Sequence, residues 1–72
     1  MRKHEVTIRI RSEAKPRVQE IVRALEGCGL SDVSVRVRFG MIHGVVDESR
    51  EDELARVEGV ESVKASARYH AL

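Results

Sequence analysis

The sequence predicts a single α+β domain, residues 1–72, with the element order βαββαβ. Segments in which apolar and polar residues alternate predict half-buried strands. Between them lie segments whose apolar residues recur at the i, i+3, i+4 spacing of an amphipathic helix. Seventy-two residues leave no room for a second domain.

The first half of the chain predicts a strand, a helix and a second strand. Val6, Ile8 and Ile10 share one face of residues 4–11, which predicts the first strand. Pro16 suits the first turn of the helix, and Gly27 is expected to follow its last turn as the C′ residue. The apolar stripe of this helix is Val18, Ile21, Val22 and Leu25. A second strand is expected over 33–39, with Val33, Val35, Val37 and Phe39 facing inward.

The second half repeats the plan. Gly40 separates the second strand from a third over 41–46, in which Ile42, Gly44 and Val46 face inward. Gly44 has no side chain, so another element can pack close to the sheet there. Asp47 and Ser49 offer helix caps, and Ser49 with Asp52 approximates a capping box for a short second helix that Gly59 ends. The fourth strand begins at Val60 and alternates as far as Tyr69.

This order is the ferredoxin-like arrangement, a four-stranded antiparallel sheet with two helices on one face. Right-handed crossovers place the first and third strands at its centre. The open face then carries six basic residues, Arg9, Arg11, Arg36, Arg38, Lys64 and Arg68, with Glu5 as the acidic residue among them. The acids concentrate around the second helix, so a chain of formal net charge +1 has two differently charged sides.

The composition points away from catalysis and cofactors. No nucleophile is paired with a base, no glycine-rich loop is placed to hold phosphate, and His and Cys lack the spacing of a metal site. We therefore expect no enzyme activity, no cofactor and no bound metal. Lys3 is followed by no apolar segment of a signal peptide and no run is of membrane-spanning length. The expectation is a cytoplasmic protein without a membrane partner, unless this sequence lacks its export signal.

Residues 40–72 resemble the subtilisin propeptide family, which includes stand-alone protease inhibitors. The similarity covers Gly40-Met41-Ile42-His43-Gly44-Val45-Val46-Asp47, then the step Gly59-Val60-Glu61-Ser62-Val63 into the last strand. It ends in Tyr69-His70-Ala71-Leu72, which is similar to the His-Ala-aromatic end of bacterial propeptides. Over residues 4–39 only the strand–helix–strand plan is shared.

The resemblance implies a non-enzymatic inhibitor or folding assistant of a subtilisin-like serine protease. The tail would lie in the substrate groove as a product-like strand. Leu72 would fill the first specificity pocket, Ala71 and His70 the next two, and Tyr69 the fourth. Family members often carry acids just after the step, where this chain has Lys64, Ala65 and Ser66. An acidic protease would suit those residues better.

Two other hypotheses about function stay open. The domain could be a protein-interaction module that self-associates through a sheet edge or face, or that meets an acidic protein surface with its basic residues. The same residues could contact a nucleic-acid backbone. Nucleic acid is the least favoured of these partners, because readers on this fold usually stack bases on aromatic residues and Phe39 and Tyr69 are predicted to face inward.

Overall fold

The structure, a computed structural model, describes residues 2–65 and has the ferredoxin-like βαββαβ order. The strands are β1 (Lys3–Ile10), β2 (Ser31–Arg36), β3 (Met41–Asp47) and β4 (Val60–Ala65). The helices are α1 (Val18–Gly27) and α2 (Glu51–Ala55). Short 3-10 segments cover Ser12–Arg17, Val37–Phe39 and Glu48–Arg50.

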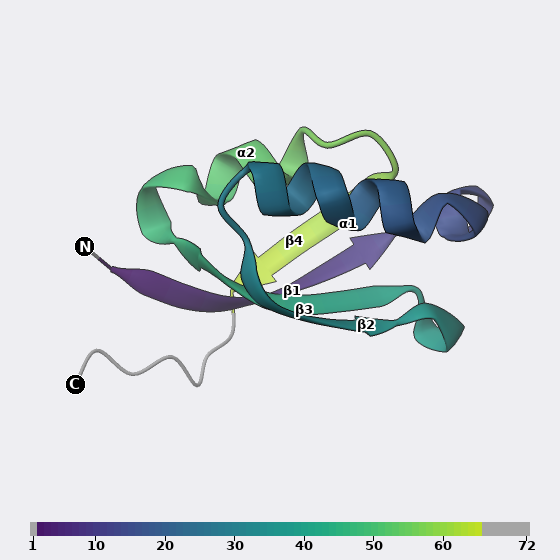
Figure 1. Cartoon of the computed structure of the whole chain (residues 1–72), viewed down its shortest axis with the longest axis horizontal. Coiled ribbons are helices and arrows are strands. Elements are labelled where there is room, and N and C mark those ends of the chain that lie inside the picture. The colour runs from purple at the N-terminus through teal and green to yellow at the C-terminus, as the bar shows by residue number, and fades with distance from the viewer. Residues whose placement is uncertain (1, 66–72) are drawn as a thin grey trace.

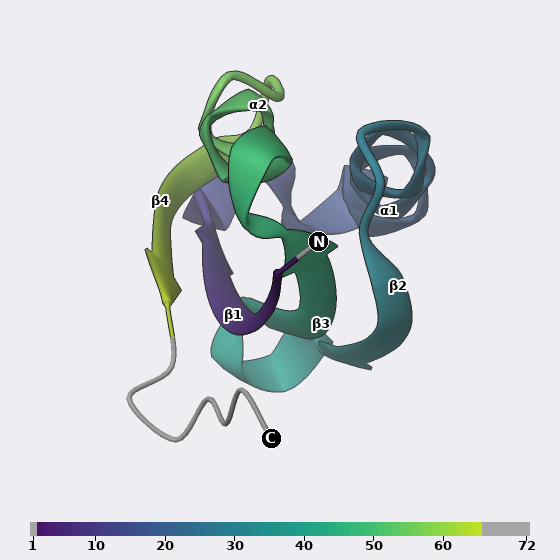
Figure 2. The same cartoon turned by 90° about the vertical axis from the view of Figure 1, so that its left-hand side faces the viewer.

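All four strands form one antiparallel sheet in the order β2-β3-β1-β4, so β1 and β3 are central as predicted. Both helices lie on the same face of this sheet, and the other face is open (Figure 1). Figure 2 shows α1 over the β2 side of the sheet and α2 over the β4 side.

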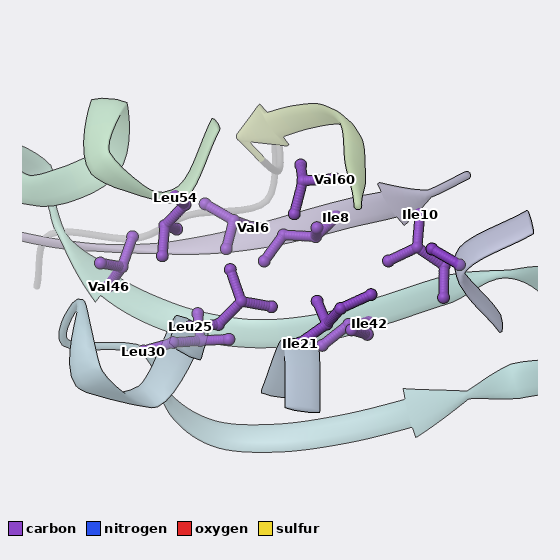
Figure 3. Close-up of a cluster of buried hydrophobic side chains, with 11 residues drawn as sticks. Val6, Ile8, Ile10, Ile21, Leu25, Leu30, Ile42, Val46, Leu54 and Val60 are labelled. Carbon is purple, nitrogen blue, oxygen red and sulfur yellow. The ribbon is translucent and has the colours of Figure 1, made fainter. Parts of the chain in front are cut away.

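The core lies between the sheet and the two helices (Figure 3). Alternation in β1 turns Val6, Ile8 and Ile10 towards the helices, and each is at least 97% buried. Ile21 and Leu25 of α1 and Leu54 of α2 pack against them. The remaining members of the hydrophobic core are Ala14, Leu30, Ile42, Val46 and Val60. The apolar stripes predicted for β1, α1 and β3 are therefore the core-forming faces.

Gly44 of β3 lets the chain entering β2 lie close to the sheet, as the sequence predicted. An added Cβ would lie 2.7 Å from both Cγ and Cδ1 of Leu30 and 3.0 Å from the carbonyl oxygen of Ser31. Leu30 is 4% exposed and has little room to move aside. Ser31, the first residue of β2, can therefore lie this close to β3 only because residue 44 is glycine.

The prediction for the second strand was wrong in the length of the strand and in the burial of its inward-facing residues. β2 ends at Arg36, and Val37–Phe39 form a 3-10 turn that closes when the N–H of Gly40 donates to the carbonyl of Val37. Gly40 has a left-handed φ of 64°, which completes the turn into β3. Phe39, expected inside, is 64% exposed. Its position on the turn, past the last sheet pair, explains the difference.

Two local helix signals also differ from expectation. Gly27 is the last residue of α1, and the left-handed residue after the helix is Gly29, with a φ of 103°. Of the two predicted caps, Asp47 is the one that caps the turn before α2, and Ser49 donates to it instead of capping the helix. The N–H and the hydroxyl of Ser49 donate to Asp47 Oδ1 at 3.0 and 3.1 Å.

His4 ties the start of β1 to the start of α2. Its Nδ1–H donates to Glu51 Oε1 at 2.9 Å, and its Nε2 lies 4.0 Å from Glu48 Oε2. The acidic residues that the sequence concentrates around α2 thus have a structural contact with β1.

Replacing Gly44 with Ala should destabilise the domain by about 1–3 kcal/mol, because the new methyl group overpacks a fixed core site. Gly27→Ala is the matched control. An added Cβ there meets nothing within 4 Å, and Ala is the better helix former by about 0.5–1 kcal/mol. Urea unfolding of both variants measures the difference. Equal effects of the two substitutions would contradict the close approach of Leu30 to β3.

Asp47→Asn should make stability less sensitive to acid. The hydrogen bond from the Ser49 main chain, and then that from its hydroxyl, lower the pKa of the folded Asp47 carboxyl below its ordinary value of 3.8. A lowered pKa stabilises the fold above pH 3.8, and that stabilisation is lost as the pH falls through the folded pKa. Asn keeps a capping oxygen but does not titrate there.

Urea unfolding midpoints at neutral pH and at several values below pH 3.8 measure this effect. Asp52→Asn is the control, since it removes a carboxylate of the same helix end that accepts neither bond from Ser49. An unchanged acid dependence in Asp47→Asn would contradict the prediction.

Candidate functional site

The open face of the sheet is built from the strand residues that alternate with the core. One row across the four strands is Arg36, Met41, Arg9 and Ser62, and the next is Ser34, His43, Thr7 and Lys64. Neighbouring strands lie about 4.8 Å apart, so Arg36 and Arg9, with β3 between them, are about 10 Å apart along their row. The face is thus a regular grid of polar and basic side chains.

A shallow depression of about 690 Å³ lies on this face. Two residues of its lining, Thr7 and His43, form a cross-strand hydrogen bond of 3.2 Å between Thr7 Oγ1 on β1 and His43 Nδ1 on β3. The other residues that line it are Glu5, Val6, Asp32, Ser34, Arg36, Gly44 and Val45. The depression offers hydrogen-bonding groups and charges of both signs, which suits contact with another polar surface.

Only part of the predicted basic surface lies on the open face. Arg9, Arg36 and Lys64 are exposed on its strands, as expected. Arg38 lies beyond β2, in the turn Val37–Phe39. Arg11 follows the last residue of β1, and its N–H donates to the carbonyl of Gly59. Both were predicted as strand residues, and both lie past a strand end.

Arg11 belongs to a different surface. It lines a depression of about 450 Å³ between the first 3-10 segment and the loop after α2. Other charged residues of that depression are Glu13, Arg17, Arg56 and Glu58. Arg68 lies outside the described residues, so three of the six predicted basic residues are placed on the face.

Asp32, which the sequence reasoning missed, brings a second acid to the face. Ser31 pairs with Val45 and Ser34 with His43. A stretch of three residues along β2 therefore lies opposite a stretch of two along β3, which makes a bulge in β2. Asp32 lies in this bulge with a φ of 52°, a left-handed conformation that Asp tolerates better than most residues. Extending the alternation of the second strand back by one residue would have placed Asp32 beside Ser34. With Asp32 added to the predicted Glu5, the face is less basic than predicted.

The predicted protease-binding tail, Tyr69, His70, Ala71 and Leu72, lies outside the described residues. The structure does describe the strand that precedes it. β4 pairs with β1 on one side only and forms the outer edge of the sheet. Its exposed residues include Glu61, Ser62 and Lys64. Residues after Ala65 therefore continue from an outer strand and not from a central one.

Residues 2–65 contain no group of three His, Cys, Asp or Glu side chains that could hold a metal ion. Cys28 is a half-buried thiol that packs against the core. In the same part of the chain, no helix combines the length and apolarity needed to cross a membrane.

Comparison of the chain with protein-family models, with curated proteins and with solved structures gives no significant match.

Proposed function

We propose that this chain binds a subtilisin-like serine protease as a propeptide-like inhibitor or folding assistant. Residues Tyr69 to Leu72 would occupy the substrate groove as a product-like strand. The observation that carries the proposal is the position of β4, an outer strand whose last residue, Ala65, is separated from Tyr69 by three residues of sequence. A strand leaving the edge of a rigid sheet is suited to pair its main chain with the edge of a partner's groove.

The side chains of the tail suit such a groove. Leu72 and Tyr69 are the two large side chains of the segment and are three residues apart. An extended segment points alternate side chains to opposite sides, so main-chain pairing supplies affinity and individual pockets read the side chains. Leu72 would anchor the first pocket and Tyr69 the fourth, with Ala71 and His70 between them.

The open face supplies a second contact surface. Arg9, Arg36 and Lys64 project from it around the Thr7–His43 hydrogen bond. Three exposed cations favour a partner whose facing surface is acidic, and rim charges of this kind act mainly on association rate and specificity. The proposed protease is therefore one with an acidic patch beside its substrate groove.

The face favours a protein partner over nucleic acid. Glu5 and Asp32 interrupt the path that a phosphate backbone would follow across the cations. The strand residues of the face include no Phe, Tyr or Trp on which a base could stack. Phe39 is exposed, but it lies on the turn between β2 and β3.

Removing Tyr69–Leu72 should abolish inhibition of a subtilisin-type protease while the domain stays folded. The substitution Leu72→Ala in the intact chain should weaken inhibition by about 10- to 200-fold, the range for lost apolar contact in a specificity pocket. The assay is hydrolysis of a chromogenic peptide at increasing concentrations of each chain.

Glu61→Ala is the matched control, because it changes an exposed residue of β4 outside the tail. It should inhibit as the parent chain does. Urea unfolding of each variant shows whether the domain is intact. Equal inhibition by the parent and by the folded, truncated chain would overturn the tail mechanism.

A further inference from the structure

The outer edge of β2 differs from the outer edge of β4. Large apolar side chains that are exposed within residues 2–65 all lie in one segment: Val35 (38%), Val37 (44%) and Phe39 (64%). On β4 the exposed positions are polar or small, so exposed apolar surface is what distinguishes the β2 edge. The β2 edge thus combines unpaired backbone groups with exposed apolar surface.

The apolar surface continues from β2 onto α1. A groove of about 500 Å³ runs between them, with Val35 and Val37 on one side and Val18 and Val22 on the other. Gln19 and Arg23 complete its lining. Val18 and Val22 are the part of the α1 stripe that the core covers only partly. A strand added beside β2 would cover both sides of this groove.

The charges of β2 are arranged so that a second copy of the same strand fits. Asp32 and Arg36 lie two residues on either side of Ser34, and both line the depression on the open face. In an antiparallel pair related by a two-fold axis at Ser34, Asp32 of one copy is opposite Arg36 of the other, twice. On the helix side Val33 is opposite Val35, also twice.

Neighbouring registers lack this match. With the axis at Val33, Asp32 would face Ser34 and Arg36 would face Leu30, beyond the end of β2. With the axis at Val35, Arg36 would face Ser34 and Asp32 would face Arg38, in the turn beyond β2. Of these three registers, only the one centred on Ser34 pairs both charges within the strand, and it also places Val33 opposite Val35.

We infer that the protein forms a two-fold symmetric dimer through antiparallel pairing of β2, centred on Ser34, which joins two sheets into one of eight strands. An isologous contact of this kind closes at two copies, since each copy uses its own β2 edge. β4 lies at the opposite edge, so the dimer leaves both β4 edges free. This inference does not depend on protease binding.

A cross-linking experiment tests the register. Ser34→Cys brings two thiols opposite each other at the axis, where Cβ atoms of paired residues lie about 4.5–5.5 Å apart. Mild oxidation should then give a disulfide-linked dimer. Ser62→Cys is the matched control, because Ser62 is also an exposed serine on an outer strand, and it should stay largely monomeric on a denaturing gel. The unsubstituted chain measures how much disulfide-linked dimer forms through Cys28 alone.

Sedimentation equilibrium tests the association without a new thiol. The parent mass should rise with concentration from 8.1 kDa towards twice that value. Val35→Lys should abolish the rise, because it places two charges against apolar partners. Asp32→Asn and Arg36→Gln should each weaken the dimer by about 2- to 30-fold, the range for two cross-strand pairs. The double variant should be no weaker than either single variant, because both remove the same contacts.

Three results would overturn the inference. One is a constant mass of 8.1 kDa up to about 1 mM. Another is oxidative dimerisation of Ser62→Cys but not of Ser34→Cys, which would move the contact to β4. The third is additive weakening by Asp32→Asn and Arg36→Gln. Failure of the tail to inhibit a protease changes none of these outcomes, so the two proposals fail separately.

Discussion

The structure depends on the burial of one side of β1. This strand pairs with β3 on one edge and with β4 on the other, so it is the strand through which the two halves of the sheet are joined. The side chains of Val6, Ile8 and Ile10 all point from β1 towards the helices. Leu25 of α1 and Leu54 of α2 belong to the same buried cluster. Loss of this apolar row would remove the surface on which both helices lie.

The core built on β1 is small, and the described part of the chain holds one cysteine, so no disulfide within it reinforces the core. Truncating one buried leucine or isoleucine commonly removes about 2–5 kcal/mol, a large share of the stability of a domain of this size. A partner that binds only the folded state adds to its stability by mass action. Protease binding and strand pairing at β2 would therefore both stabilise the fold.

The alternation of apolar residues predicted the central strands well because these strands are buried on one face and paired along their length. Ile42, Gly44 and Val46 all lie inside as expected. The same pattern misled at Val35, Val37 and Phe39, since period-two alternation marks which side a residue takes and not whether anything covers that side. It also gives no strand end, which is why Arg11 and Arg38 were placed on the sheet.

The candidate site was predictable in its residue types but not in its shape. Arg9, Arg36 and Lys64 were placed on the open face from alternation alone, and the structure agrees. Asp32 reaches the same face within a bulge, and the bulge is set by the pairing of β2 with β3 rather than by the residues of either strand alone. The role of Tyr69–Leu72 rests on sequence, because these residues follow the last one that the structure describes.

The strand order also shapes how the chain can fold. β1 is the first strand in sequence, yet its two neighbours, β3 and β4, begin at Met41 and Val60. During synthesis β1 leaves the ribosome before either partner strand exists, and its apolar row is fully covered only after both α1 and α2 have emerged. Such a topology has a high contact order, so folding is slower than in a helical bundle of equal length and is completed only once β4 is available.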